Sequence, residues 1–290
     1  MSPSLLQIVL LALIQGAAEL LPVSSSAHVI VAEKLMHLDP SSPEMVFLMI
    51  MLHAGTMVAV IAYFWKSWRS AYFPDGVSAF ASLYRIAVAT ASTAVLVGIL
   101  MVAIQRVVFH GRRGASVEDL TGHLGIVCVS LFLVGILIIV AGLRSRASQA
   151  APAPGAVSTP LAAAIGAVQG ICLPFRGLSR SGGTISASML LGVPRRAAEE
   201  FSFALAVVIT PPIIAREYWR LYKSRSLGHG DVHLAALAGP GLLGMAFSFL
   251  AGLAALRWLS AWLEHGRWHY FGIYCLVASA GVGALALSGF

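Results

Sequence analysis

Residues 15–28 read Gln-Gly-Ala-Ala-Glu-Leu-Leu-Pro-Val-Ser-Ser-Ser-Ala-His, and this stretch interrupts an otherwise apolar segment. An apolar run leads into it from residue 5, and a second, shorter run follows it to residue 38. A segment broken by proline and serines is tolerated at membrane depth only where its backbone is buried in protein or lines a wet cavity. Residues 5–38 therefore predict a re-entrant helical hairpin.

Residues 160–193 have the same design, because an apolar run breaks at a Ser/Gly/Arg cluster and then resumes. The two regions are also related by a constant offset of 154 positions, without a gap. The matching pairs are Gln15 and Gln169, Gly16 and Gly170, Ser25 and Ser179, Pro40 and Pro194, Phe47 and Phe201, and Trp65 and Trp219. These identities predict an internal repeat.

The composition places the whole chain in a membrane. Of its 290 residues, 58% are hydrophobic and only 11% are charged, whereas a soluble domain carries about 25% charged residues. This excludes a soluble globular enzyme. Six further runs approach the roughly 20 apolar residues that span a bilayer. They are Met45–Trp65, Tyr84–Gln105, His123–Leu143, Phe201–Trp219, Val232–Leu256 and Tyr270–Leu287.

We therefore expect an all-α integral membrane protein with six transmembrane helices and two re-entrant hairpins. Residues 1–143 form the N-terminal repeat, residues 144–159 a linker rich in Ala, Pro, Ser and Gly, and residues 160–290 the C-terminal repeat. Each repeat has three spans after its hairpin. An odd number of crossings inverts the second repeat, so the two hairpins should meet near the bilayer midplane.

The basic balance of the chain, a net charge of +7, points to lipid headgroups and not to nucleic acid. Lys and Arg stand singly or in pairs in the links between apolar runs, where they anchor spans. The two faces collect nearly equal numbers of them, so the positive-inside rule gives no orientation. Cys128, Cys172 and Cys275 lie in apolar stretches without CxxC spacing, which is typical of core residues.

Two polar residues of the first hairpin, Gln15 and Glu19, are four positions apart and share one helix face. A carboxylate within an apolar run needs a cation, a metal or a wet cavity. The alternative is a structural pair between Glu19 and an arginine. We favour a functional site, because Ser24, Ser25 and Ser26 follow at the expected start of a helix.

Three hydroxyls beside free backbone N–H groups form a suitable cradle for phosphate, although N-capping alone explains any single serine. His28 adds a group that exchanges a proton near neutral pH. The second hairpin supplies arginine, hydroxyl and glycine groups that suit an anion. These groups belong to Arg176, Gly177, Ser179, Arg180, Ser181 and Thr184.

Together these motifs resemble the undecaprenyl-diphosphate phosphatase family of the bacitracin-resistance type. The resemblance runs through most of the chain and rests on five blocks. They are Gln15-x-x-x-Glu19, Pro22-Val-Ser-Ser with His28, His53-Ala-Gly-Thr, Gly177-x-Ser179-Arg180-Ser181-x-x-Thr184, and Glu200-Phe-Ser-Phe. The resemblance implies a bacterial inner-membrane hydrolase that removes the terminal phosphate of undecaprenyl diphosphate during peptidoglycan (cell-wall) lipid recycling. Its site would open to the outer side.

The resemblance also implies roles for residues and a divalent cation, Mg²⁺ or Ca²⁺. Glu19, Ser25, His28 and Arg180 would be catalytic, with Glu19 and Gln15 holding the metal. From the resemblance together with the chemistry of the residues themselves, we expect the substrate to contact Gln15, Ser24, Ser26, Arg176, Gly177, Ser179, Ser181 and Thr184. One position departs from the family pattern, since Arg176 stands where the family has proline. A homodimer is a candidate assembly.

Two questions stay open at this level. Ser25 could attack the phosphate with His28 as its base, or His28 could activate water or protonate the leaving group. A transporter or flippase of polyprenyl phosphate is the alternative function, since broken helices in an inverted repeat also build secondary carriers.

Overall fold

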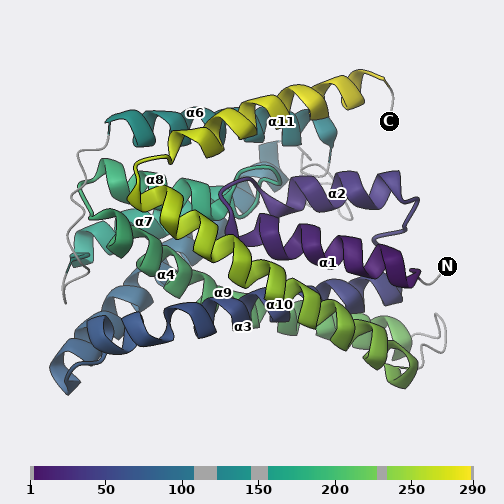
Figure 1. Cartoon of the computed structure of the whole chain (residues 1–290), viewed down its shortest axis with the longest axis horizontal. Helices are drawn as coiled ribbons and strands as arrows, with labels where there is room; N and C mark the ends of the chain where they lie inside the picture. Colours follow the sequence, from purple (N-terminus) through teal and green to yellow (C-terminus); the bar gives the residue numbers. More distant parts are fainter. Residues whose placement is uncertain (1–2, 108–122, 145–155, 227–233, 289–290) are drawn as a thin grey trace. The chain divides into compact units, whose positions relative to one another are not determined.

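The computed structural model describes residues 3–107, 123–144, 156–226 and 234–288, and in these ranges the regular structure is entirely helical (Figure 1). The helices follow one another as α1 (Leu5–Leu20), α2 (Ser25–Leu35), α3 (Pro43–Tyr72), α4 (Gly76–Val107), α6 (Leu124–Arg144), α7 (Thr159–Cys172), α8 (Arg180–Leu190), α9 (Arg195–Ser226), α10 (Leu234–Glu264) and α11 (His269–Leu287).

Six of these helices, α3, α4, α6, α9, α10 and α11, are long and apolar enough to cross a membrane. They coincide with the six predicted runs, so this prediction is confirmed. Several helices are longer than their apolar part. For example, α4 begins at Gly76 and not at Tyr84, because Asp75 accepts hydrogen bonds from the backbone N–H and the hydroxyl of Ser78, both at 2.9 Å. These bonds cap the helix and hold the pKa of Asp75 below its usual value.

The exposed surface of α4 indicates whether this fold is surrounded by water or by lipid. Leu83, Val95, Ile99 and Val102 of this helix are all more than half exposed. In water such an apolar surface would drive association, but in a bilayer it faces lipid tails at no cost. The exposed apolar residues therefore support the multi-span membrane protein that the composition predicts.

The remaining four helices form two pairs of short helices. In the first pair α1 has 16 residues and α2 has 11, and in the second α7 has 14 and α8 has 11. At 1.5 Å per residue even α1 measures only about 24 Å, which is less than the roughly 30 Å hydrocarbon core. The two members of each pair pack against each other, and Figure 1 shows α1 beside α2.

The contacts within the chain divide it into two compact units, to which both predicted repeats contribute. Unit 1 comprises Met1–Leu20, Ser25–Trp65 and Ala206–Leu259. Unit 2 comprises Leu21–Ser24, Lys66–Leu205 and Ser260–Phe290. The predicted division at residues 144–159 stays a prediction, and residues 145–155 of that linker lie outside the described residues.

Unit 1 packs its helices closely through small residues. A Cβ atom on Gly16 of α1 would lie 2.6 Å from the Ser248 carbonyl oxygen and 2.7 Å from the Ala251 Cβ, both on α10. Ser248 also donates from its hydroxyl to the Leu52 carbonyl of α3 at 2.9 Å. Small residues and interhelical hydrogen bonds are the usual means of helix association in membranes, where lipid provides no hydrophobic driving force.

Unit 2 repeats this kind of contact between α7 and α4. A Cβ atom on Gly170 would lie 2.9 Å from both the Thr93 carbonyl oxygen and the Leu96 Cβ. Thr93 donates to the Gly166 carbonyl at 2.7 Å and accepts from the Gln169 side-chain amide at 3.1 Å. Elsewhere in unit 2, Trp268 is fully buried and donates from its indole N–H to Ser186 of α8 at 2.9 Å.

The contact at Gly16 gives a stability prediction. Gly16→Ala forces a methyl group against the backbone of α10, so we expect the free energy of unfolding to fall by about 1–3 kcal/mol. Gly98→Ala is the matched control, because a Cβ there meets nothing within 4 Å, and it should leave stability unchanged or raise it by up to about 1 kcal/mol. Thermal unfolding of both variants in one detergent measures the difference, and equal shifts would contradict this packing.

Candidate active site

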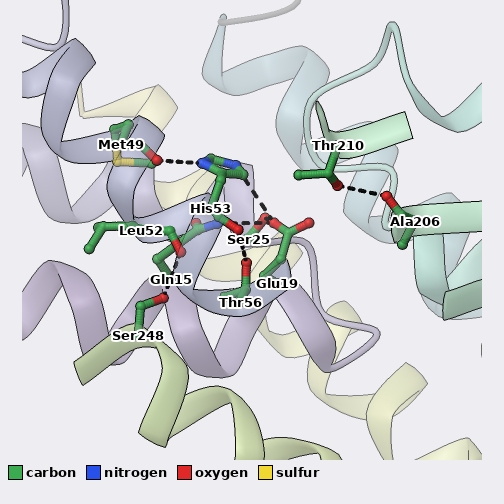
Figure 2. A network of polar contacts seen from close by, with 10 residues as sticks. All are labelled: Gln15, Glu19, Ser25, Met49, Leu52, His53, Thr56, Ala206, Thr210 and Ser248. Carbon is green, nitrogen blue, oxygen red and sulfur yellow. Dashed lines mark hydrogen bonds and ion pairs between the residues drawn. The ribbon is translucent and has the colours of Figure 1, made fainter. Parts of the chain in front are cut away.

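The Glu19 carboxylate is the centre of a polar network in unit 1 (Figure 2). Glu19 lies in the last turn of α1, with Gln15 one turn earlier, and the Gln15 side-chain amide donates to the Glu19 Oε2 atom at 3.1 Å. Ser25, the first residue of α2, donates from its hydroxyl to the same oxygen at 2.6 Å. The prediction that Gln15 and Glu19 share one face is therefore confirmed, and Ser25 joins them.

The break between α1 and α2 follows from the local sequence. Helix α1 ends at Leu20, and Pro22 has no backbone N–H to continue it. Ser24 then adopts a left-handed conformation with φ of 67°, although it is not a glycine, and it is 5% exposed. Such backbone strain in a buried serine is uncommon away from functional sites. Helix α2 starts at the next residue.

His53 of α3 is a member of this network to which the sequence analysis assigned no role. Its Nε2 atom lies 4.0 Å from the Glu19 Oε2 atom, and the two side chains are 35% and 19% exposed. Its Nδ1 atom lies 2.8 Å from the Met49 carbonyl oxygen one turn earlier, and Thr56 donates to the His53 carbonyl at 2.9 Å. The sequence feature that could have identified His53 as a site residue is its position as a histidine inside the apolar run Met45–Trp65.

His28 lies in the same first turn of α2 as Ser25 and Ser26, and all three are half-buried. The hydroxyl of Ser25 has one hydrogen, and the structure directs it to Glu19. In this arrangement Glu19, and not His28, is the acceptor for the Ser25 proton. Both residues stay candidates for proton transfer at later steps.

The second cluster of predicted residues lies in unit 2 at the start of α8. Ser179 is the N-cap residue, and its hydroxyl accepts from the Gly182 N–H at 3.1 Å. The Ser179 and Ser181 oxygens are 3.4 Å apart, and Ser181 donates to the Leu21 carbonyl at 3.4 Å. Ser179, Ser181 and Thr184 are each less than 5% exposed. Ordinary N-capping thus accounts for the contact of Ser179 with Gly182.

Thr184 lies one turn further along α8. Its hydroxyl oxygen is 2.9 Å from the Arg180 carbonyl oxygen and 2.6 Å from the Ser202 Oγ atom of α9. Ser202 belongs to the Glu200-Phe-Ser-Phe block. That block therefore supports the start of α8, which gives it a structural role in this part of the site.

The loop before α8 explains one glycine and places two arginines. Gly177 has φ of +95°, and a Cβ atom there would lie 2.6 Å from the Val127 carbonyl oxygen, so the turn requires glycine. Arg180 is half-buried as the first residue of α8, whereas Arg176 is exposed. Arg176, which stands where the family has proline, thus lies at the surface of this loop.

The Glu19 network also satisfies the chemistry of a magnesium or calcium ligand set. Within the described residues no group of three or more His, Cys, Asp and Glu side chains gathers to hold a metal. Mg²⁺, however, is usually bound through one or two carboxylates together with substrate phosphates. One carboxylate, the Ser25 hydroxyl and the Gln15 amide oxygen are hard oxygen donors of the required kind.

The fold and these two clusters define a multi-span, helical membrane protein with a carboxylate–hydroxyl pair and a Ser/Arg-rich helix start, groups suited to a phosphate ester or anhydride. The comparisons give the family. Residues 8–281 match the family model described as bacitracin resistance protein BacA, and the chain belongs to this family.

Relatives align with the chain over almost its whole length. Undecaprenyl-diphosphatase 2 of Acinetobacter baylyi is 52% identical over 97% of this chain and 98% of its own. Undecaprenyl-diphosphatase 2 of Burkholderia ambifaria is 33% identical over 95% and 94%. Undecaprenyl-diphosphatase of Gluconobacter oxydans is 30% identical over 98% and 99%. The family expected from the motifs is therefore confirmed.

Proposed function

We propose that this protein hydrolyses undecaprenyl diphosphate to undecaprenyl phosphate and inorganic phosphate. The observation that carries this function is the 52% identity, over nearly the whole chain, to a relative named for that reaction. The structure adds a chemical reason, because the Ser25 hydroxyl is 2.6 Å from a carboxylate oxygen that can accept its proton. The enzyme is an integral membrane hydrolase acting on a phosphoric anhydride.

Two chemical routes fit the Glu19 network. In the first, the Ser25 oxygen forms a bond to the terminal phosphorus, the bridging P–O bond breaks, and the Ser25 proton passes to Glu19. Undecaprenyl phosphate leaves with the bridging oxygen, and water then releases the phosphate from Ser25. In the second route water attacks the same phosphorus directly, His28 accepts a proton from the water, the bridging P–O bond breaks, and Ser25 only positions Glu19.

Replacing Ser25 distinguishes the two routes. If Ser25 is the nucleophile, Ser25→Ala should lower turnover by about 10²-fold or more, and denatured wild-type protein should carry a phosphoserine after a short incubation. His28→Ala should lower turnover by about 10²–10⁴-fold by either route, because a water must be activated in both, either for the direct attack or to release phosphate from Ser25. A Ser25→Ala enzyme that keeps most of its turnover, while the His28→Ala enzyme loses it, would exclude the serine route.

The second cluster binds phosphate in this proposal. Arg180 offers a planar, permanently charged fork that matches phosphate oxygens. The start of α8 adds backbone N–H groups and the positive end of the helix dipole. Ser24, Ser26, Arg176, Gly177, Ser179, Ser181 and Thr184 complete the proposed substrate contacts.

A divalent cation, Mg²⁺ or Ca²⁺, is part of the proposal, with Glu19 and Gln15 as its protein ligands. When bound, it neutralises charge that develops on the diphosphate. We expect turnover to vanish in excess EDTA and to return when the cation is restored in excess of chelator. The measurement is phosphate release at fixed substrate, with EDTA presaturated with Ca²⁺ as the control. Unchanged turnover in EDTA would remove the metal from the mechanism.

We further propose that the two halves are inverted repeats and that the short helix pairs are re-entrant. Within the described residues, each half has five helices in the same order, two short and then three long. Gly16 contacts Ser248 and Ala251, while Gly170 contacts Thr93 and Leu96. The glycines are 154 positions apart, and their contacts are offset by almost the same number. One short helix of each pair, α1 or α7, thus packs on a long helix of the other repeat.

The surroundings of the enzyme follow from its substrate class. A C55 polyprenyl diphosphate lies in the membrane, so we propose the bacterial inner membrane with the site open to its outer side. Charge bias does not fix this orientation, and a homodimer stays a prediction.

The alternative of a carrier that only moves polyprenyl phosphate finds no support in the comparisons, since the relatives cited above are named as diphosphatases. Purified protein in detergent micelles tests the choice, because a micelle has no second leaflet. The proposed function predicts phosphate release there. Saturable binding of the lipid without release would favour the carrier.

A further inference from the structure

His53 has the hydrogen-bonding state of a metal ligand. The Met49 carbonyl can only accept a hydrogen bond, so the Nδ1 atom of His53, 2.8 Å away, carries the hydrogen. In the neutral ring the lone pair is then on Nε2, which lies 4.0 Å from the Glu19 Oε2 atom. Histidines that bind metals almost always donate their other ring N–H to a carbonyl or carboxylate in this way.

His265 shows that a hydrogen bond from Nδ1 to a helix carbonyl does not by itself indicate a metal ligand. Its Nδ1 atom makes the same bond to the Ala261 carbonyl at 2.6 Å, and its side chain is exposed. Among the described residues, however, His265 forms no ion pair with a carboxylate. The feature that distinguishes His53 is the half-buried carboxylate that its second nitrogen faces (Figure 2).

The spacing of the two atoms suits one shared cation. Ligand atoms lie about 2.1 Å from a small divalent metal, so two ligands on one ion are at most about 4.2 Å apart. The observed separation of 4.0 Å falls just inside this limit. It is too long for a direct hydrogen bond between His53 and Glu19.

We propose that His53 is a nitrogen ligand of the divalent cation bound by Glu19. The inference rests on the proposed function, and it adds a ligand and a metal preference. Oxygen ligands suit Mg²⁺ and Ca²⁺, whereas an imidazole raises affinity for transition metals. The site therefore binds Mn²⁺ more tightly than an oxygen-only site would.

Metal binding would also affect the hydrogen bond between Ser25 and Glu19. The Glu19 Oε2 atom already accepts two hydrogen bonds, from Gln15 and Ser25, which use both of its lone pairs. A cation bound to this oxygen would compete with one of these hydrogen bonds. The Ser25 hydroxyl oxygen, 2.6 Å from the carboxylate oxygen, would then be a further oxygen donor beside the cation.

Pulsed electron paramagnetic resonance with Mn²⁺ alone tests the ligand without any turnover. Full-length protein in detergent, loaded with substoichiometric Mn²⁺, should show echo modulation from a directly bound ¹⁴N nucleus. His53→Gln and His53→Asn should lose this modulation and bind Mn²⁺ at least about tenfold more weakly. His265→Gln is the matched control and should keep both properties.

Three results would overturn the proposal: wild type that fails to bind Mn²⁺, bound Mn²⁺ without nitrogen modulation, or modulation that persists in the His53 variants. Size-exclusion profiles establish whether each variant is folded. If both variants misfold, the wild-type spectrum with ¹⁵N-labelled histidine decides the question, since a histidine ligand must change the modulation. Phosphate release by wild-type protein is measured separately, so failure of this inference and failure of the proposed function are distinguishable.

Discussion

Glu19→Gln should lower phosphate release from undecaprenyl diphosphate by about 10²–10⁴-fold, the range for loss of a group that accepts a proton or holds a metal. Glutamine keeps the size of the side chain and an oxygen that can accept from Ser25, so the network of Figure 2 should persist without its charge. The measurement is kcat and KM with purified variants of equal monodispersity.

Glu44→Gln is the control for this substitution. Glu44 lies in the first turn of α3, in the same unit and half-buried, but in the described contacts it takes no part in the Glu19 network. Its variant should retain wild-type turnover. Glu19→Gln protein with turnover within threefold of wild type would remove the carboxylate from the reaction.

Arg180→Ala should be nearly as severe, with a loss of about 10²–10³-fold in kcat/KM, because its charge acts on a highly charged diphosphate. The kcat/KM of Arg180→Lys should fall between that of the wild type and that of Arg180→Ala, since lysine supplies the charge without the planar fork. If Arg180 acts mainly on the ground state, the loss will appear in KM. If it acts on the transition state, kcat will fall as well.

Arg144→Ala separates this effect from a general loss of positive charge. Arg144 is exposed at the end of α6, also in unit 2, and its removal changes the net charge by the same amount. We expect no change in kcat/KM for it. Equal activity of the Arg180→Ala and Arg144→Ala proteins would show that Arg180 does not bind substrate.

Hydropathy was sufficient to predict the six spanning helices but not their ends. Apolar length marks only the part of a helix in hydrocarbon. It could not show that α3 continues from Trp65 to Tyr72, or that Asp75 starts α4 before its apolar run. Helix ends depend on polar caps, which carry no hydropathy signal.

Local spacing likewise predicted the local part of the site. Gln15 and Glu19 meet because an i, i+4 pair on one helix must share a face. The hydrogen bond between Ser25 and Glu19 spans the break between α1 and α2. In that break Ser24 has a left-handed backbone conformation, which residue propensities do not predict for a serine. His53 reaches Glu19 from another helix, and a contact between distant segments is set by tertiary packing. A single sequence does not reveal such a contact.

The most direct test of the central claim follows the oxygen that enters the products. Purified protein is incubated with undecaprenyl diphosphate in ¹⁸O-labelled water, and both products are analysed by mass spectrometry, with Glu19→Gln protein as the blank. Attack at the terminal phosphorus, by Ser25 and then water or by water alone, predicts equimolar undecaprenyl phosphate and phosphate, with one ¹⁸O atom in the phosphate only. Label in undecaprenyl phosphate, or no cleavage at all, would contradict the proposed reaction.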